Sequence, residues 1–542
     1  MPLTTEDLAL PALRTRYAAG GTPTALCREL LPALAAAHGV FISRPCDEEV
    51  LERCRFLEAQ PPEQHGALWG VPFAVKDNID VAGHPTTAAC PDFEYVPSQH
   101  ARAVQPLLDA GGIFVGKTNL DQFACGLVGT RTPYGVPANA FDDRFTPGGS
   151  SCGSAVAVAE GLCTFALGTD TAGSGRVPAG NNGIVGIKPS VGRFSTTGVV
   201  PACYLLDCVS VFALSVEDGA EVARLMENSD IADPTFRQPN LASLQKRYSS
   251  GAAFRFALPG PEFLDSSFQG PGGEPVRREM AAAMAQAVER LVALGGQQVL
   301  DFDFAPFAET AVLLYGAAFV AERYAGIRQF LEACPGTKPP QLPALASLHG
   351  DERLLKVIRR IISQTERFNA PDVFQGLQEL SVLKAKMRAE LAKVDVLVVP
   401  TSAYNYTVQE IQAEESDPAY EAVCFTKNAN LGRWTNFVNL GDMCGVSVFS
   451  GLLRPPTSAV VANGVNGSHD AAAEAEQQRR QMHLAATGNP APVLPFGITL
   501  LAPAWTDEFV AGLAAAYQQT TGLKAGPAGH GVTPYRTAAP AK

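Results

Sequence analysis

The spacing of apolar residues divides the chain into segments with different predicted elements. Near the N-terminus, apolar residues recur at helical spacing, so residues 5–59 are predicted to be mainly helical. From about residue 61 to 220, short apolar runs such as 71–75 and 113–115 alternate with glycine-rich turns. This alternation is typical of strands in an α/β sheet.

The second half of the chain predicts long helices followed by buried strands. Residues 277–294 and 382–391 have helical periodicity, and the apolar run 394–399 predicts a buried strand. Two further strands are predicted around 441–450 and 494–502. We therefore expect one large mixed sheet covered by helices.

The same patterns suggest how the chain is organised. Residues 1–60 predict a helical segment packed on the core, and 61–523 predict the main domain. Residues 453–492 are rich in Ala, Glu and Gln and predict a surface insertion, partly helical, since long loops are tolerated thermodynamically. The Gly/Pro/Ala-rich residues 524–542 predict a flexible tail.

Composition excludes several classes of protein. Hydrophobic residues make up 46% of the 542 residues and charged residues 18%, which is incompatible with disorder over most of the length. The net charge is −12 and no dense basic run occurs, so nucleic acid is not expected as a partner. The twelve cysteines form no CxxC pair and no cluster with histidines, so neither a metal nor a cofactor is expected.

The composition also predicts a cytoplasmic location. The first residues, MPLTTEDLALPALRTRY, carry acids and lack the basic and apolar regions of a signal peptide. No run of 18 or more apolar residues predicts a membrane span. Scattered cysteines are typical of free thiols in a reducing compartment.

Two familiar motifs match literally and are rejected on context. Residues 111–118 fit the phosphate-loop pattern GxxxxGK[ST], but the apolar Ile-Phe-Val lies where the loop should be. Residues 149–153 fit the GxSxG nucleophile elbow, but turn residues and not a strand precede them. An elbow triad also needs a downstream histidine, and three of the four available lie in the predicted insertion or tail.

Three separated segments, unlike the two rejected motifs, all point to the same kind of active site. They are GVPFAVKDN, which ends the first strand with Lys76; TPGGSSCGS, which contains Ser150; and LGTDTAGSGR, which contains Ser174. Together with GKTNLDQFA (116–124), they resemble the amidase signature family over roughly residues 5–523. The resemblance implies an α/β fold with one large mixed central sheet, helices on both faces and an N-terminal helical segment.

The resemblance assigns catalytic roles that are chemically reasonable. It implies that Ser174 is the nucleophile, that Ser150, on a cis peptide, relays the proton, and that Lys76 is the base. A lysine acts as a base only when neutral, so its pKa must fall by about three units from 10.4 through burial. The turn 171–174 (Thr171, Ala172, Gly173 and Ser174) is predicted to aim backbone N–H groups at one point as an oxyanion hole. Asp170 and Arg176 are interpreted as a buried structural pair, and Lys117 as part of the supporting framework.

The sequence around these motifs most resembles the allophanate hydrolases within the family. The resemblance implies that Tyr315 and Arg323 bind the substrate's carboxylate and that Gly126 lines the same pocket. An Arg fork suits a small planar carboxylate, and on one helix a spacing of eight would place both side chains toward one side. It therefore implies hydrolysis of the C–N amide bond of allophanate with release of ammonia, in urea degradation.

The resemblance also bears on partners and alternatives. It implies a functional link to urea carboxylase and leaves a homodimer open; the C-terminal domain that many relatives carry after the amidase core is not expected. Two enzyme alternatives are the amidase subunit of a tRNA-dependent amidotransferase and another small-amide amidase. An inactive binding or assembly subunit is a third, against which the intact Lys76, Ser150 and Ser174 argue.

Overall fold

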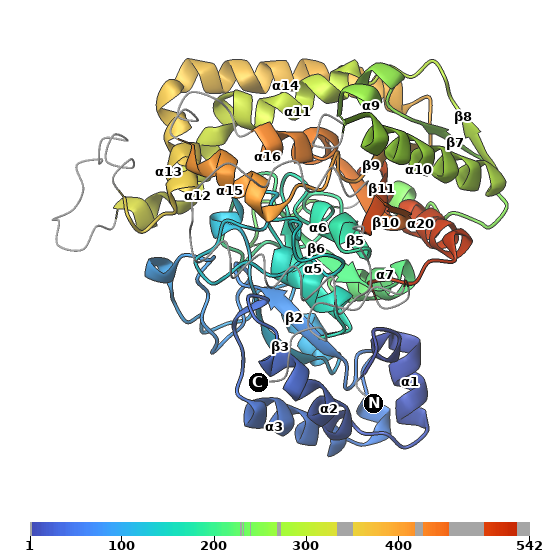
Figure 1. Cartoon of the computed structure of the whole chain (residues 1–542). Coiled ribbons are helices and arrows are strands. Elements are labelled where there is room, and N and C mark those ends of the chain that lie inside the picture. Colours follow the sequence, from blue (N-terminus) through green and yellow to red (C-terminus); the bar gives the residue numbers. More distant parts are fainter. Residues whose placement is uncertain are drawn as a thin grey trace.

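A computed structural model describes residues 3–227, 230, 232–238, 240–267, 273–332, 351–417, 426–454, 493–527 and 530. Figure 1 shows the N-terminal helices at one end of the molecule and the long helices α11 and α14 at the opposite end. None of the helices in the described ranges combines the length and apolar composition needed to span a membrane.

Eleven strands in the described ranges form one sheet. Parallel and antiparallel neighbours both occur, so the predicted mixed sheet is confirmed. In spatial order the strands are β1 (Phe41–Ser43), β3 (Ile113–Thr118), β2 (Pro72–Lys76), β4 (Phe165–Asp170), β6 (Cys208–Ala213), β5 (Val185–Lys188), β10 (Met443–Leu453), β11 (Leu494–Pro503), β9 (Val396–Pro400), β7 (Phe254–Ala257) and β8 (Gly296–Gln298).

Helices cover both faces of this sheet, as the alternation of strand side chains shows. In β9 and β11, Val398 and Leu500 pack into one apolar cluster, while Leu397 and Leu501 pack into another. Successive side chains of a strand point to opposite faces, so the two clusters lie on opposite sides. The first cluster is closed by α10 (Gly273–Ala293) and α20 (Asp507–Thr521), and the second by α11 (Ala305–Gly316), α14 (Ala370–Leu391) and α17 (Asn436–Leu440).

The remaining helices are shorter or lie at the edges of the sheet. They are α1 (Leu10–Ala18), α2 (Pro23–Ala35), α3 (Asp47–Glu58), α4 (Gln105–Asp109), α5 (Cys152–Ala159), α6 (Val177–Asn181), α7 (Val216–Leu225), α8 (Leu241–Leu244), α9 (Pro261–Ser267), α12 (Ala321–Glu332), α13 (Lys356–Ser363), α15 (Val408–Ser416) and α16 (Thr426–Leu431).

The N-terminal segment contains a strand that the helical pattern did not predict. α1, α2 and α3 bury residues such as Leu13, Leu30 and Leu57 in the main core, but β1 lies between α2 and α3 and pairs antiparallel with β3. Three residues are too few to show strand periodicity in the sequence, so β1 is recognised only by its pairing with β3 in the structure. The boundary at residue 60 stays a prediction.

The predicted core elements otherwise agree with the structure within a few residues. Helix α10 covers the predicted 277–294 except its last residue, α14 includes 382–391, and β9, β10 and β11 match the three predicted strands within a few residues. Strand β3 begins at Ile113, between the glycines of the rejected phosphate-loop match, and continues through Gly116, so a strand occupies the place where the loop would lie, as predicted.

The predicted insertion and tail lie largely outside the described residues. Leu453 of β10 pairs with Leu494 of β11, and residues 455–492 between them are not described. At the start of the predicted tail, the N–H of Gly526 donates to the carbonyl of Gly183 at 3.0 Å, and His530 stacks near Phe141. Residues 528, 529 and 531–542 are not described.

Candidate active site

Two neighbouring strands and one helix bring the candidate catalytic groups to one edge of the sheet. Strand β2 ends at Lys76 and pairs in parallel with β4, which ends at Asp170. The carboxyl ends of parallel strands meet at the same edge, which is where α/β sheets place their sites. Ser150 lies just before α5, a helix that packs on β2 and β4, and Ser174 lies on the turn that follows β4.

Lys76 is completely buried, and among the described residues it donates hydrogen bonds only to hydroxyl groups. Its Nζ donates to Ser150 Oγ at 2.7 Å and to Thr169 Oγ1 at 2.7 Å. Among the described residues, no carboxylate lies within ion-pair distance of this amine. Burial lowers the pKa of Lys76 to about 7, against the weaker opposing effect of Cys152 and more distant acids. An amine with this pKa is available as a base near neutral pH.

The peptide that carries Ser150 is cis and is tightly enclosed. The Gly149–Ser150 bond is cis, and the carbonyl of Ser150 accepts a hydrogen bond from the N–H of Asp121 at 3.1 Å. A Cβ on Gly149 would collide with the Asp121 carboxylate, so only glycine fits there. The same carboxylate accepts N–H groups of Gly129 at 3.0 Å and Arg131 at 2.9 Å, which fixes its position.

The turn 171–174 is organised around the carboxylate of Asp170. The N–H of Gly173 donates to Asp170 Oδ1 at 2.8 Å, so this group is directed at the carboxylate and not at a substrate. The N–H groups of Thr171, Ala172 and Ser174 make no hydrogen bond to any described residue. Three of the four predicted oxyanion-hole donors are therefore open.

Ser174 itself is 3% exposed, and within the described ranges its hydroxyl forms no hydrogen bond to Ser150. A nucleophile and its relay often come into hydrogen-bond contact only in the complex with substrate. Gly173 has a φ of +126°, and a Cβ at this position would meet the side chain of Thr435. The turn next to the nucleophile thus requires a glycine.

Asp170 and Arg176 form the buried structural pair that was predicted. Arg176 Nε and Nη2 donate to the two oxygens of Asp170 at 2.8 and 2.9 Å, and both side chains are inaccessible to solvent. Burial opposes ionisation of Asp170, but Arg176 outweighs it and lowers the pKa of this carboxyl. Because the carboxylate also holds Gly173 and Gly175, the pair fixes the turn that carries Ser174.

Tyr315 and Arg323 meet, although they do not share a helix as predicted. The chain is extended at Ala317 between α11 and α12, so the spacing argument for one helix is wrong. Arg323 Nη2 nevertheless donates to the Tyr315 hydroxyl at 2.8 Å, and the guanidinium lies 4.9 Å from the ring centre. Arg323 Nη1 donates to Cys125 Sγ at 3.5 Å. Cys125 directly precedes Gly126, so this contact brings the segment that contains Gly126 close to Tyr315 and Arg323.

A buried carboxylate connects this pair to the turn that carries the nucleophile. Asp207 accepts a hydrogen bond from the hydroxyl of Thr171 and from the N–H groups of Ala202 and Cys203, at 2.8 and 3.2 Å. Tyr315 packs in the same apolar cluster as Ala172 and Cys203. The predicted catalytic and binding residues therefore belong to one continuous region.

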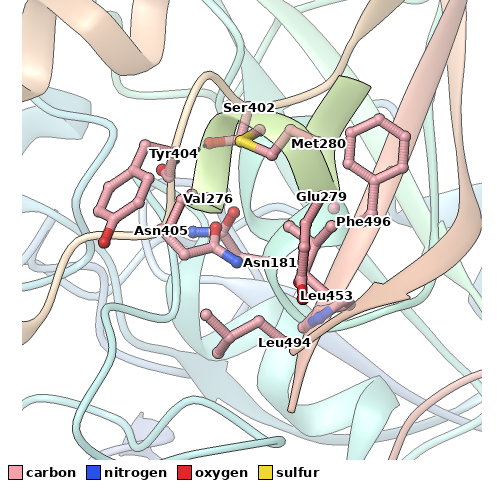
Figure 2. A pocket seen from close by; sticks show the side chains of 13 residues that line it. Asn181, Val276, Glu279, Met280, Ser402, Tyr404, Asn405, Leu453, Leu494 and Phe496 are labelled. Atoms are coloured by element: carbon pink, nitrogen blue, oxygen red, sulfur yellow. Dashed lines mark hydrogen bonds between the residues drawn. The ribbon is translucent and has the colours of Figure 1, made fainter. Parts of the chain in front are cut away.

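A separate small pocket lies elsewhere in the molecule. Figure 2 shows Asn181 and Asn405 among apolar side chains such as Leu494 and Phe496. Neither Lys76 nor either candidate serine lines it. Its volume of about 20 Å³ is the space of about one water molecule, too small for an organic substrate.

The sequence reasoning did not single out several residues that complete the site. Thr169, Asp121, Asp207 and Cys125 all contact predicted site residues. Thr169 could have been found, because it belongs to the quoted LGTDTAGSGR segment on the strand beside Lys76. In the part of the chain that the structure describes, no group of three or more His, Cys, Asp or Glu side chains could hold a metal ion.

The Amidase family model matches residues 33–510. The chain belongs to the amidase family. The resemblance inferred from the three motifs is thereby confirmed, as is the α/β fold class.

Within the family, the chain is similar to proteins of several kinds. The chain is 41% identical over 418 residues to urea amidolyase of Saccharomyces cerevisiae, covering 77% of this chain and 21% of that protein. It is 31% identical to a Glutamyl-tRNA(Gln) amidotransferase subunit of Acidobacterium capsulatum, covering 82% of this chain and 92% of that one. The solved structure of Kluyveromyces lactis allophanate hydrolase is 34% identical with a TM-score of 0.75, covering 95% of this chain and 72% of that one. This chain thus spans about a fifth of the length of the urea amidolyases that it matches.

Proposed function

We propose that this chain hydrolyses the C–N amide bond of allophanate and releases ammonia. The observation that carries the substrate assignment is Arg323, a buried guanidinium that faces the Tyr315 hydroxyl and has no carboxylate partner among the described residues. A buried cation of this kind is suited to a small anionic substrate. The likeness to urea amidolyase and allophanate hydrolase supports the same substrate.

Lys76, Ser150 and Ser174 would carry out the acyl transfer. Neutral Lys76 accepts the Ser150 hydroxyl proton, Ser150 accepts the proton of Ser174, and Ser174 Oγ attacks the terminal carbamoyl carbon. A neutral amine has two N–H groups and one lone pair, so Lys76 can accept from Ser150 while it still donates to Thr169. Ammonia leaves with the relayed proton, and water then hydrolyses the acyl-enzyme to N-carboxycarbamate.

Open N–H groups in the turn after β4 would stabilise the oxyanion. Thr171, Ala172 and Ser174 supply these donors in the proposed mechanism, whereas Gly173 is committed to Asp170. A donor that is already oriented needs no reorganisation during the reaction, which is why such groups accelerate acyl transfer. No cofactor takes part in any of these steps.

The proposal also includes a cellular context. Allophanate is the carboxylation product of urea, so we propose that a urea carboxylase supplies the substrate and that the reaction takes place in the cytoplasm. Self-association as a homodimer stays a proposal, which the oligomeric state of the purified chain in solution tests.

The test is a substrate panel with the purified chain. We expect ammonia release from allophanate and little from glutamine, which would instead be the donor for the amidotransferase alternative. Arg323→Ala should lower kcat/KM for allophanate at least about tenfold, because hydrogen bonds to charged groups contribute about 1.5–3 kcal/mol. Consumption of biuret, which carries an amide in place of the carboxylate, should fall far less.

Equal losses on allophanate and biuret would assign Arg323 to the fold. Release of ammonia from glutamine alone would replace the proposed function by the amidotransferase alternative. A folded chain inactive on every amide would favour a binding or assembly role.

A further inference from the structure

Three buried arginines of this protein differ in what neutralises them. Arg176 holds the carboxylate of Asp170, and Arg131 Nε donates to Glu415 Oε1 at 2.7 Å. Arg323 is equally buried, at 3% exposure, but makes no ion pair with any described residue. The first two have the environment of structural residues, and the third has no ion-pair partner within the described ranges.

The groups that hydrogen-bond to Arg323 are a hydroxyl and a thiol, whereas the carboxylates of Asp207 and Glu322 interact with its charge from farther away and form no ion pair with it among the described residues. Nη2 donates to the Tyr315 hydroxyl, Nη1 donates to the thiol of Cys125, and Nε has no hydrogen-bond partner within the described ranges. Burial raises the pKa of the nearby Cys203, so the Cys203 thiol stays protonated. Burying a cation without an ion-pair partner is costly, which indicates that an anionic ligand completes this environment.

The thiol of Cys125 is held in place by an unusual backbone. Phe123 and Ala124 directly before it both have left-handed conformations, with φ of 50° and 54°. Non-glycine residues seldom adopt this region, and such conformations cluster at functional sites. The carbonyl of Cys125 accepts a hydrogen bond from Arg131 Nη1 at 2.8 Å, so the structural Arg131–Glu415 pair anchors this turn.

We propose that Cys125 is a positioning residue that orients the guanidinium of Arg323 without neutralising it. A thiol is a weak hydrogen-bond partner, so it holds Nη1 and leaves the positive charge available to the substrate. A carboxylate at the same position would pair with Arg323 and take the place of the substrate's own carboxylate. Cys125 thereby contributes to selectivity for a monoanion, an inference that rests on the proposed hydrolysis of allophanate.

The main experiment compares two variants of equal shape and different charge. Cys125→Asn and Cys125→Asp place nearly isosteric side chains beside Arg323, and only Asp is anionic. Initial rates are measured for allophanate and for biuret, together with KM and kcat, after urea unfolding has shown that each variant is folded. Relative to Cys125→Asn, Cys125→Asp should lose about 100-fold in kcat/KM for allophanate, because a charged contact of the substrate is replaced.

Biuret separates a positioning role from a purely structural one. It lacks the carboxylate, so its consumption by the two variants should agree within about threefold. Equal losses of Cys125→Asn and Cys125→Asp on allophanate, or equal losses of Cys125→Asp on both substrates, would overturn the inference. Failure of the unaltered chain on allophanate would instead overturn the proposed function, and with it the substrate carboxylate assigned to Arg323.

Smaller changes keep the inference testable if an aspartate prevents folding. Cys125→Ala removes only the contact to Nη1, so KM for allophanate should rise up to about tenfold while kcat changes little. Cys125→Ser retains a hydrogen-bonding group and should restore most of that loss. A matched control is Cys90→Ser, since Cys90 lies in the same apolar cluster but donates to the carbonyl of Arg353 and not to a candidate site residue. An unchanged KM in Cys125→Ala, or an equal effect of Cys90→Ser, would contradict the inference.

Discussion

Two completely buried lysines lie on neighbouring parallel strands and have opposite surroundings. Lys117 of β3 forms an ion pair with Asp77, with Nζ 3.4 Å from Oδ1. Lys76 of β2 contacts the hydroxyls of Ser150 and Thr169 instead. Both lie in strands whose every residue is buried, so burial does not separate them.

The presence of a carboxylate partner decides what each lysine can do. Burial lowers the pKa of both amines, but Asp77 opposes the shift at Lys117. At Lys76 the shift reaches about 7, so a large fraction of this amine is neutral at physiological pH. A buried lysine becomes a candidate base where hydroxyls replace the carboxylate, and it becomes part of the structural framework where a carboxylate remains.

Replacing Lys76 should therefore impair catalysis, whereas replacing Lys117 should impair stability. Lys76→Met is expected to lower kcat by about 10⁴ or more, and Ser174→Ala by a similar factor, since members of one catalytic unit fail together. The midpoint of urea unfolding should not fall in Lys76→Met, because the variant no longer buries an unpaired amine. Substantial activity in either variant would remove these residues from the mechanism.

Lys117→Met is expected to act mainly on stability. It leaves the buried carboxylate of Asp77 without its cation, which costs about 3–5 kcal/mol in comparable cases. The free energy of unfolding in urea should fall by this order, and adding Asp77→Asn should recover part of the loss. If Lys117→Met unfolds at the same urea concentration as the unaltered chain, the ion pair is not structural.

The pH dependence of the rate sharpens the comparison. Neutral Lys76 is the active form and its pKa is about 7, so kcat/KM should fall about tenfold per pH unit below that value. The loss occurs as the pH decreases, because protonation removes the lone pair that accepts the serine proton. A profile that is flat from pH 5 to 8 would show that another group limits the reaction.

Thr169→Val should produce the smallest change. The Thr169 hydroxyl accepts a hydrogen bond from Lys76 and so favours the charged amine, and its loss lowers the pKa further. The acidic limb of the pH profile should move to lower pH by about one unit, with a modest loss of kcat. Thr171→Val is a matched control two residues further along the chain, since the Thr171 hydroxyl contacts Asp207 and not Lys76.

Much of the core could be predicted because its elements are local patterns. The apolar runs that became β9 and β11 and the helical periodicity of α14 show their type within a few turns of chain. The exceptions have physical causes. Three residues are too short for β1 to show a period, and the extended residue Ala317 interrupts the helix expected to join Tyr315 and Arg323.

The sequence by itself determined the candidate residues, since glycine-rich turns and their serines are contiguous motifs. It also determined that Lys76 would end a buried strand. Only the tertiary structure decided which lysine and which arginine have no carboxylate within ion-pair distance among the described residues. Thr169 reaches Lys76 across 93 residues, and Cys125 reaches Arg323 across 198. Burial and charge compensation depend on groups that folding brings together from distant parts of the chain, so no local pattern records them.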